Sequence, residues 1–208
     1  MDSAPMTETR LHPTLSTATA TYRLQLRGGV TFDAAAEWIP YLSGLGVSHL
    51  YLSPPFTATE GSTHGYDVTC PDALDPVLGG PEGFERLAAA ARRAGIGIIL
   101  DIVPNHTAFS TANPWLRDVL RHGRDSRYAR HFDIDWSRPL MLPWLGNPLP
   151  EVLASAPAEI AEEPDGPVLR LAGLSLPLAP GAVAGPLDRA GLAALLDGQA
   201  WRLAHWRL

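Results

Sequence analysis

Two kinds of hydrophobic spacing alternate over the first half of the chain. Apolar and polar residues alternate from Thr21 to Leu26, and short apolar runs extend from Val47 to Ser53 and from Ile96 to Leu100. Such alternation, and short apolar runs bounded by glycine or polar residues, are typical of β-strands. We therefore predict three strands over these segments.

Between the strands, apolar positions recur at intervals of three and four. One stretch extends from Phe32 to Leu45, with Thr31 as its N-cap, and another from Pro81 to Ala94. This spacing predicts two helices. Pro40 lies inside the first, where it removes a backbone donor, so we expect a kink or a break there.

The alternation of strand and helix predicts a parallel sheet. Parallel strands joined by right-handed crossovers end on the same side of the sheet. The ends of the three strands, at Leu26, Ser53 and Asp101, should therefore share one rim. A polar loop from Pro54 to about Gly80 leaves this rim, and connections of that length are usually functional.

The rest of the chain has a different pattern. Residues 1–18 are polar and aperiodic, which predicts a loose N-terminal tail before the strand and helix region at 19–106. Half of the 20 prolines fall from Pro139 to Pro186, so we interpret residues 107–186 as an inserted region. Within it, the apolar runs on either side of Ala172 and Gly173 predict a small hairpin.

Residues 187–208 return to helical spacing and predict a helix that leads back to the first region. Trp201, Ala204, His205 and Leu208 would share one of its faces. The helix would end without a glycine, proline or polar cap, so we expect the native chain to continue. We also expect Trp38, Phe84 and Trp201 to pack inside, since each lies on an apolar stripe.

Composition narrows the class of protein. The 208 residues are 46% hydrophobic and carry a formal net charge of −6, from 22 acidic and 16 basic residues, all of which are arginine. This balance is typical of a soluble globular protein. The longest basic grouping, Arg117 to Arg130, is interrupted by acidic residues, so we interpret it as a solvated face and expect no nucleic acid as a partner.

The single cysteine, Cys70, has no internal disulfide partner, and the first residues contain no apolar stretch of signal-peptide length. These features favour a cytoplasmic location. No window approaches the ~18 consecutive apolar residues that a membrane span needs, so we expect no membrane partner.

Two polar segments fall on the shared rim: 61–67 follows the second strand and 101–106 follows the third. In parallel α/β folds, the loops at the carboxyl ends of the strands hold the ligand. The candidate binding residues are His64, Tyr66, Asp67, Asp101, Asn105 and His106. Their donors, acceptors and flat aromatic face suit a ring that carries many hydroxyls, such as a sugar.

The same residues also fit two roles that involve no sugar. The Asp-x-x-x-Asn-His run suits a strand cap that ties down a loop equally well. His64, Asp67, Asp101 and His106 could also converge as metal ligands. We favour metal binding less, because the first strand supplies no histidine or aspartate and neither histidine pair has the spacing of ligands on a helix or ribbon. We therefore expect no metal and no other cofactor.

At these segments the sequence resembles a known family. The run Asp-Ile-Val-Pro-Asn-His, 101–106, is similar to the block at the third strand of the α-amylase superfamily, whose fold is the eightfold β/α barrel. Further stretches resemble the maltooligosyltrehalose synthases of that superfamily: 21–26, 48–54, 61–68, 132–136 and 200–208. The likeness extends from about Thr19 to the end of the chain.

The resemblance implies an α/β fold, namely the first three β/α units of a (β/α)8 TIM barrel with an inserted domain B after His106. It also implies that Tyr66 stacks on a sugar ring, that Asp101 and His106 hydrogen-bond to the ring or support it, and that Asn105 steadies the loop.

The resemblance says less about the other residues of this loop. The roles of His64 and Asp67 follow only from their lying in the same loop as Tyr66. Family members usually have an acidic residue where this chain has Cys70, before Pro71, so the role of that acidic side chain is not carried over.

The family's activity converts the terminal α-1,4 linkage of a maltooligosaccharide into an α,α-1,1 linkage by intramolecular glucosyl transfer with retention. Retention requires two carboxyl groups about 5–5.5 Å apart. In the family these groups follow the fourth and fifth strands, so we expect them, and a third supporting acid, beyond Leu208. This chain should then contain no catalytic residue and show no turnover alone.

The implied substrate is a maltooligosaccharide or a glycogen-derived glucan, and the implied partner is the missing half of the barrel. Two alternatives are a noncatalytic α-glucan-binding partial barrel, and another hydrolase or transglycosidase of the superfamily.

Overall fold

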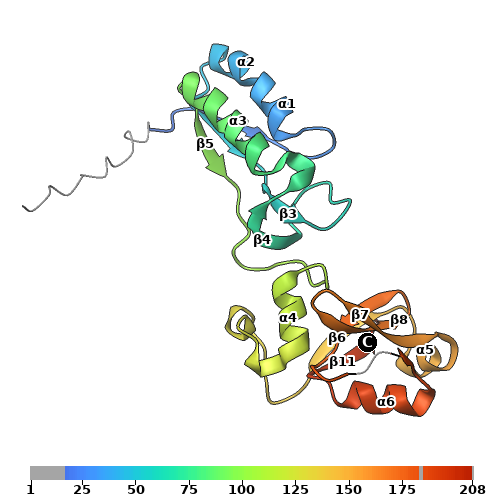
Figure 1. The fold of residues 1–208 in the computed structure, drawn as a ribbon. Coiled ribbons are helices and arrows are strands. Elements are labelled where there is room, and N and C mark those ends of the chain that lie inside the picture. Colours follow the sequence, from blue (N-terminus) through green and yellow to red (C-terminus); the bar gives the residue numbers. More distant parts are fainter. Residues whose placement is uncertain (1–16, 183–184, 208) are drawn as a thin grey trace, which may run out of the picture. The chain divides into compact units, whose positions relative to one another are not determined.

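The chain forms two compact units, residues 1–107 (unit 1) and 108–208 (unit 2) (Figure 1). The computed structural model describes residues 17–182 and 185–207. The expected tail, 1–18, lies almost entirely outside the described residues. No helix in the described part of the chain is long and apolar enough to cross a membrane.

Unit 1 is built on a parallel sheet of three strands in the order β1 (Thr21–Leu24), β2 (His49–Leu52) and β5 (Gly97–Leu100). The three predicted strands and their parallel direction are confirmed, with slightly shorter bounds. Leu50 and Leu52 are fully buried on one face of the sheet. Successive side chains of a strand point to opposite faces, so Tyr51 projects from the other face.

Three helices supply the partners for the buried face: α1 (Phe32–Glu37), α2 (Ile39–Gly44) and α3 (Gly80–Arg93). The Thr31 hydroxyl caps α1 by accepting from the Ala34 amide at 3.2 Å, as expected. The first predicted helix breaks at Trp38, because Pro40 has no amide hydrogen to continue α1 and instead lies in the first turn of α2. The break leaves Trp38 42% exposed, so its predicted burial is wrong.

The connection after β2 contains more structure than the predicted loop. It forms an antiparallel pair, β3 (Phe56–Ala58) and β4 (Val68–Leu74), followed by a 3-10 turn, η1 (Pro76–Leu78). Val68 and Thr69 are buried in this pair, and Cys70 lies opposite Thr57. The irregular loop predicted over 54–80 is therefore reduced mainly to residues 59–67, between the two strands.

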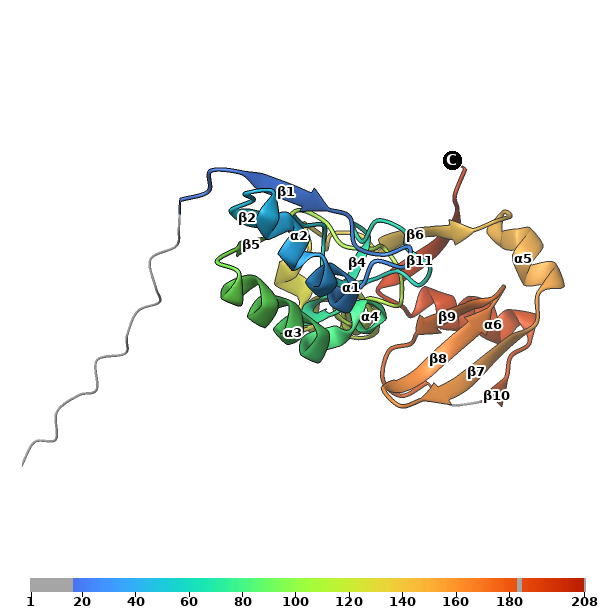
Figure 2. The same cartoon turned by 90° about the horizontal axis from the view of Figure 1, so that it is seen from above.

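Unit 2 begins with α4 (Pro114–His122), the short turns η2 (Gly123–Asp125) and η3 (Ala129–His131), β6 (Leu140–Leu145) and α5 (Leu149–Ser155). An antiparallel sheet follows, in the order β10-β7-β8-β9 (Figure 2). Its strands are β7 (Ala158–Glu163), β8 (Gly166–Leu171), β9 (Leu174–Pro177) and β10 (Gly185–Pro186). The predicted hairpin is confirmed as β8 and β9.

The helix predicted over 187–208 is only half present. α6 (Arg189–Asp197) ends at Gly198, and the chain then forms a strand, β11 (Trp201–His205), parallel to β6. The positions 201, 204 and 205 fit a helix, but the alternation of buried Trp201 and Leu203 fits the strand that β6 pairs with. Trp201 is fully buried, as expected, but on a strand, and Leu208 lies outside the described residues.

The basic run in unit 2 was predicted to be a solvated face, and this prediction is wrong for Arg121. Arg121 is buried, and its Nη1 donates to the carbonyl oxygens of Pro167 and Leu178 at 2.9 and 3.1 Å. Arg117 pairs with Asp165 at 2.5 Å. Buried backbone carbonyls need donors, and the Arg121 guanidinium supplies them to these two carbonyls.

Candidate functional site

A hydrogen bond joins the two polar segments in unit 1. The Tyr66 hydroxyl, from the loop between β3 and β4, donates to Asp101 Oδ2 at 2.6 Å. Asp101 directly follows β5, and its own amide is fixed by a 2.9 Å hydrogen bond to the carbonyl of Leu52, in β2. The predicted meeting of these two segments at the carboxyl ends of the strands is therefore present for Tyr66 and Asp101.

Two residues that the sequence analysis did not select complete this cluster. Arg23 in β1 donates through Nη2 to the Tyr66 hydroxyl at 3.1 Å, and its guanidinium lies 5.9 Å from the centre of the Tyr51 ring. Polar interaction with Asp101, then desolvation and the charge of Asp101, raise the pKa of the Tyr51 phenol in β2. Arg23 and Tyr51 are register partners on neighbouring strands.

The loop that carries Tyr66 is ordered by its own side chains. The Tyr66 amide donates to Nδ1 of His64 at 3.0 Å, and the two rings stack at 6.0 Å with an interplanar angle of 28°. Since Nδ1 uses its lone pair in this bond, the ring proton of His64 lies on Nε2. Its 3.7 Å approach to Asp67 is too long for a hydrogen bond.

Asp67 closes the loop from the other side. Its Oδ1 accepts from the Ser62 hydroxyl at 2.5 Å, and its backbone carbonyl accepts from the Thr59 amide at 3.0 Å. Burial raises the pKa of Asp67, but the hydrogen bonds from Ser62, the backbone and Thr59 outweigh it and hold the pKa below its ordinary value. Asp67 is therefore an ionised acceptor that holds the loop at neutral pH.

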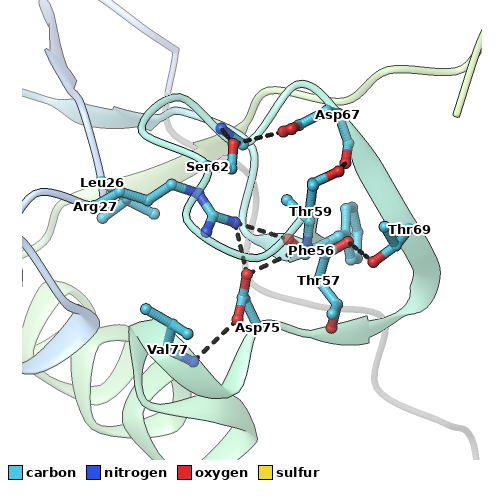
Figure 3. A network of polar contacts seen from close by, with 12 residues as sticks. Leu26, Arg27, Phe56, Thr57, Thr59, Ser62, Asp67, Thr69, Asp75 and Val77 are labelled. Carbon is cyan, nitrogen blue, oxygen red and sulfur yellow. Dashed lines mark hydrogen bonds and ion pairs between the residues drawn. The ribbon is translucent and has the colours of Figure 1, made fainter. Parts of the chain in front are cut away.

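Beneath the loop lies a buried ion pair (Figure 3). Arg27 Nη2 donates to Asp75 Oδ2 at 2.7 Å and to the Phe56 carbonyl at 3.2 Å, and the two charged side chains are only 5% and 4% exposed. Asp75 also accepts from the amides of Val77 at 2.9 Å and Ala58 at 3.3 Å. This network joins the end of β1 to both ends of the β3–β4 pair.

Gly65 places the loop against this ion pair. A Cβ atom at Gly65 would lie 2.8 Å from Arg27 Nε and 2.9 Å from the Pro54 carbonyl oxygen, so only hydrogen fits there. Its φ of +80° is also a conformation that residues with a side chain rarely adopt. The positions of His64 and Tyr66 on either side of Gly65 therefore depend on the Arg27 guanidinium.

The structure brings together four of the six predicted residues. Asn105 and His106 lie in the irregular segment after β5, and both are exposed. In the described ranges, 17–182 and 185–207, no hydrogen bond or ring contact joins either of them to Tyr66 or Asp101. They are close to Asp101 in sequence, but their side chains are open to solvent.

The chemistry of the cluster is that of hydrogen bonding and stacking. It presents one carboxylate, two phenols and one guanidinium on the sheet face opposite the helices. Within the described part of the chain, no three or more His, Cys, Asp or Glu side chains gather closely enough to hold a metal ion. The arrangement can accept hydrogen bonds from hydroxyls at Asp101 and offer an aromatic face at Tyr66.

Comparison with protein families gives one match to more than half of the chain. Residues 29–156 match the α-amylase catalytic domain. The matched segment includes β2, β5, the Tyr66 loop and Asp101.

Individual relatives match more of the chain. A putative maltooligosyl trehalose synthase of Mycobacterium tuberculosis is 46% identical over 199 residues, which is 90% of this chain and 24% of that protein. A crystal structure of a maltooligosyl trehalose synthase aligns with a TM-score of 0.81 and 37% identity, over 92% of this chain and 26% of the other. The Arthrobacter ramosus maltooligosyltrehalose synthase gives a TM-score of 0.75 and 39% identity, over 90% and 24%.

The chain thus spans about a quarter of the length of these relatives. The expected resemblance to maltooligosyltrehalose synthases is confirmed, and an α/β partial barrel agrees with both the family match and these structures. The chain belongs to the α-amylase family.

Proposed function

We propose that unit 1 forms the first three β/α units of a (β/α)8 barrel and that unit 2 is its inserted domain B. The order β1-β2-β5, with helices on one face, supports the first assignment. Unit 2 follows directly on the segment after the third barrel strand, where a domain B is inserted. Because β11 pairs with β6, we include residues 187–207 in domain B instead of assigning them to the barrel.

We further propose that this is part of a trehalose-forming enzyme, a (1→4)-α-D-glucan 1-α-D-glucosylmutase. Its reaction would convert the reducing-end α-1,4 linkage of a maltooligosaccharide or glycogen-derived glucan into an α,α-1,1 linkage by retaining transfer. Similarity to maltooligosyl trehalose synthases over 90% of this chain supports the assignment. The free, unpaired Cys70 fits a reducing compartment, and we assign the protein to the cytoplasm.

The observation that carries the proposal is the hydrogen bond between Tyr66 and Asp101. Tyr66 would stack on a glucose ring, and Asp101 would accept hydrogen bonds from its hydroxyls. His106 would add a second hydrogen bond, with Asn105 steadying its segment. His64 and Asp67 would hold the loop. The His106 side chain is exposed and therefore accessible to a sugar.

The catalytic carboxylates would belong to the three quarters of the relatives' length that this chain does not span. Retention needs a nucleophile and an acid/base about 5–5.5 Å apart. On this assignment, unit 1 binds and orients the glucan and performs no bond cleavage.

Calorimetry of the chain against maltoheptaose tests the binding role. We expect measurable heat with the wild-type chain and its loss in Tyr66→Ala. Tyr41→Ala is the matched control, because Tyr41 lies in α2, is 67% exposed, and is remote from the loop in sequence. Equal binding by the Tyr66 variant, or no binding by the wild-type chain, would overturn the proposed role.

A second measurement tests the division of labour. Maltoheptaose incubated with the chain alone should keep all of its reducing ends, whereas the longer protein that contains the chain should consume them and form a trehalose unit. Turnover by the chain alone would place catalytic residues within it.

A further inference from the structure

Arg23 and Tyr51 project from the face of the unit 1 sheet opposite to the one on which α1, α2 and α3 pack. They are paired in register across β1 and β2, while the neighbouring residues Leu24 and Leu50 are buried on the helix side. In register, Tyr51 is also the partner of Ile99 in β5, one residue before the end of that strand. The cluster around Asp101 is therefore built on the sheet as well as on the loops.

Hydrogen-bond chemistry fixes the direction of every proton in this cluster. An arginine side chain only donates, so the Tyr66 hydroxyl accepts from Arg23. The one proton of that hydroxyl is then available to Asp101, which accepts it at 2.6 Å. The direction is therefore Arg23 to Tyr66 to Asp101.

Arg23 forms no ion pair with a carboxylate in the described part of the chain, unlike Arg27 and Arg86. The second hydrogen bond of Arg23 Nη2 goes to the neutral amide oxygen of Gln25 at 3.2 Å. An arginine that served only as a surface charge would gain more from a carboxylate. Its contacts instead hold the Tyr66 hydroxyl.

We propose that Arg23 is a positioning residue for glucan binding: it fixes the Tyr66 hydroxyl in its hydrogen bond to Asp101. The proposal rests on the function proposed above. An ionised carboxylate offers about four acceptor sites. The Tyr66 hydroxyl takes one of them, and the sites that remain can only accept. Asp101 then selects a ligand that presents hydroxyl donors, as a glucose ring does.

The first test measures position without any sugar. In protein with isotopically labelled tyrosine, the χ1 coupling constants of Tyr66 should show one rotamer in the wild-type chain. They should average in Arg23→Met and return toward the single rotamer in Arg23→Lys. Arg86→Met is the matched control, because Arg86 is an exposed arginine of the same unit that pairs with Asp33. A single Tyr66 rotamer retained in Arg23→Met would overturn the proposal.

The Tyr51 phenol gives a second reading in the same samples. The positive charge of Arg23 lowers the pKa of Tyr51, against the larger effect of Asp101, so its removal should raise that pKa further. The carbon signal of the Tyr51 ring next to the hydroxyl, assigned with Tyr51→Phe, reports the change. No change in Arg23→Met would mean that Arg23 lies elsewhere, which contradicts the proposal.

The second test adds maltoheptaose. Arg23→Met should weaken binding about tenfold, since a charge-assisted hydrogen bond is lost. In a Tyr66→Phe background, the same substitution should have little further effect, because the hydroxyl it positions is gone. Equal losses in both backgrounds would overturn the positioning role. If the wild-type chain binds no glucan, the proposed function falls, and the Tyr66 rotamers still decide whether Arg23 positions that ring.

Discussion

Both units contain an aspartate paired with arginine, but the two aspartates differ in their access to water. In unit 1, Arg27 and Asp75 are 5% and 4% exposed. In unit 2, Asp165 lies in the turn between β7 and β8, is 46% exposed, and pairs with Arg117 and Arg121 of α4. Hydrogen bonds from Arg117 lower the pKa of Asp165 to about 2, against a smaller opposing effect of burial.

The buried Arg27–Asp75 pair supports the candidate site, whereas the Asp165 pairs support the fold of unit 2. When a buried pair loses one partner, the other charge stays in a medium of low polarity, whereas water replaces the partner of an exposed charge. The Arg27 pair also lies under Gly65, between His64 and Tyr66, so damage there reaches the candidate site. The Asp165 network joins α4 to the β7–β8 turn, and its loss should stay within unit 2.

The largest expected effect comes from Asp75→Asn, which removes the charge and leaves Arg27 buried without a counter-ion. We expect a loss of about 3–5 kcal/mol in the stability of unit 1. Native-state hydrogen exchange at the Leu50 and Leu52 amides, in the core of unit 1, measures it. The matched control is Asp33→Asn, which breaks the exposed pair with Arg86 and should change little. Similar small effects in both variants would show that water reaches the Arg27 pair.

The next largest effect is a difference in stability loss between substitutions at two glycines that have nearly the same backbone conformation. Gly65 has φ +80° and Gly173, in the β8–β9 turn, has φ +78°, but a Cβ at Gly173 would meet nothing within 4 Å. Gly173→Ala should cost only the backbone strain, about 1–2 kcal/mol. Gly65→Ala adds the collision with Arg27 and Pro54 and should cost about 2–4 kcal/mol.

Thermal unfolding of the two glycine variants measures this difference, and maltoheptaose binding provides a second contrast. Gly65→Ala should also weaken binding, because Tyr66 is the next residue, while Gly173→Ala should leave it unchanged. If the two variants lose the same stability and bind equally well, the loop does not depend on the Arg27 guanidinium.

The fold of unit 1 was predictable where its signals are local. Strand alternation and helical spacing identified β1, β2, β5 and two helical stretches, and Pro40 marked the break that divides the first into α1 and α2. Among the strands of the described residues, β3, β4, β6, β7, β10 and β11 were not predicted, and two of them show why. β3 is only three residues long and lies in a polar loop. In β11, positions 201, 204 and 205 fit a helix, while positions 201 and 203 fit a strand, and pairing with β6 decides between them.

The candidate site was predictable only where its polar side chains follow the ends of strands. Tyr66 and Asp101 stood out because both follow predicted strands. Arg23 was missed because it lies within a strand, although its alternation with buried Leu24 placed it on the opposite face. No local pattern pairs Arg23 with Tyr51, or Arg27 with Asp75 across 48 positions, because only the folded register and packing bring them together.

The smallest expected effect is the acid sensitivity of unit 2. The pKa of Asp165 in the folded chain is about 2, below its ordinary value of 3.8, so the carboxylate stabilises the folded state above about pH 4 and this contribution is lost as the pH falls toward 2. Since the side chain is 46% exposed, solvent screening reduces the contribution to about 1 kcal/mol.

Urea unfolding between pH 2 and 6, followed by tryptophan fluorescence, reports mainly on unit 2, because five of the six tryptophans lie there. Asp165→Asn should remove about 1 kcal/mol at pH 6 and only a small part of that at pH 2. Asp197→Asn is the matched control, since Asp197 is an exposed aspartate of α6 with no ion pair in the described part of the chain. An equal loss at both pH values would mean that the Asp165 carboxylate stabilises unit 2 by shape and not by charge. The contrast with the buried pair of unit 1 would then reflect packing and not access to water.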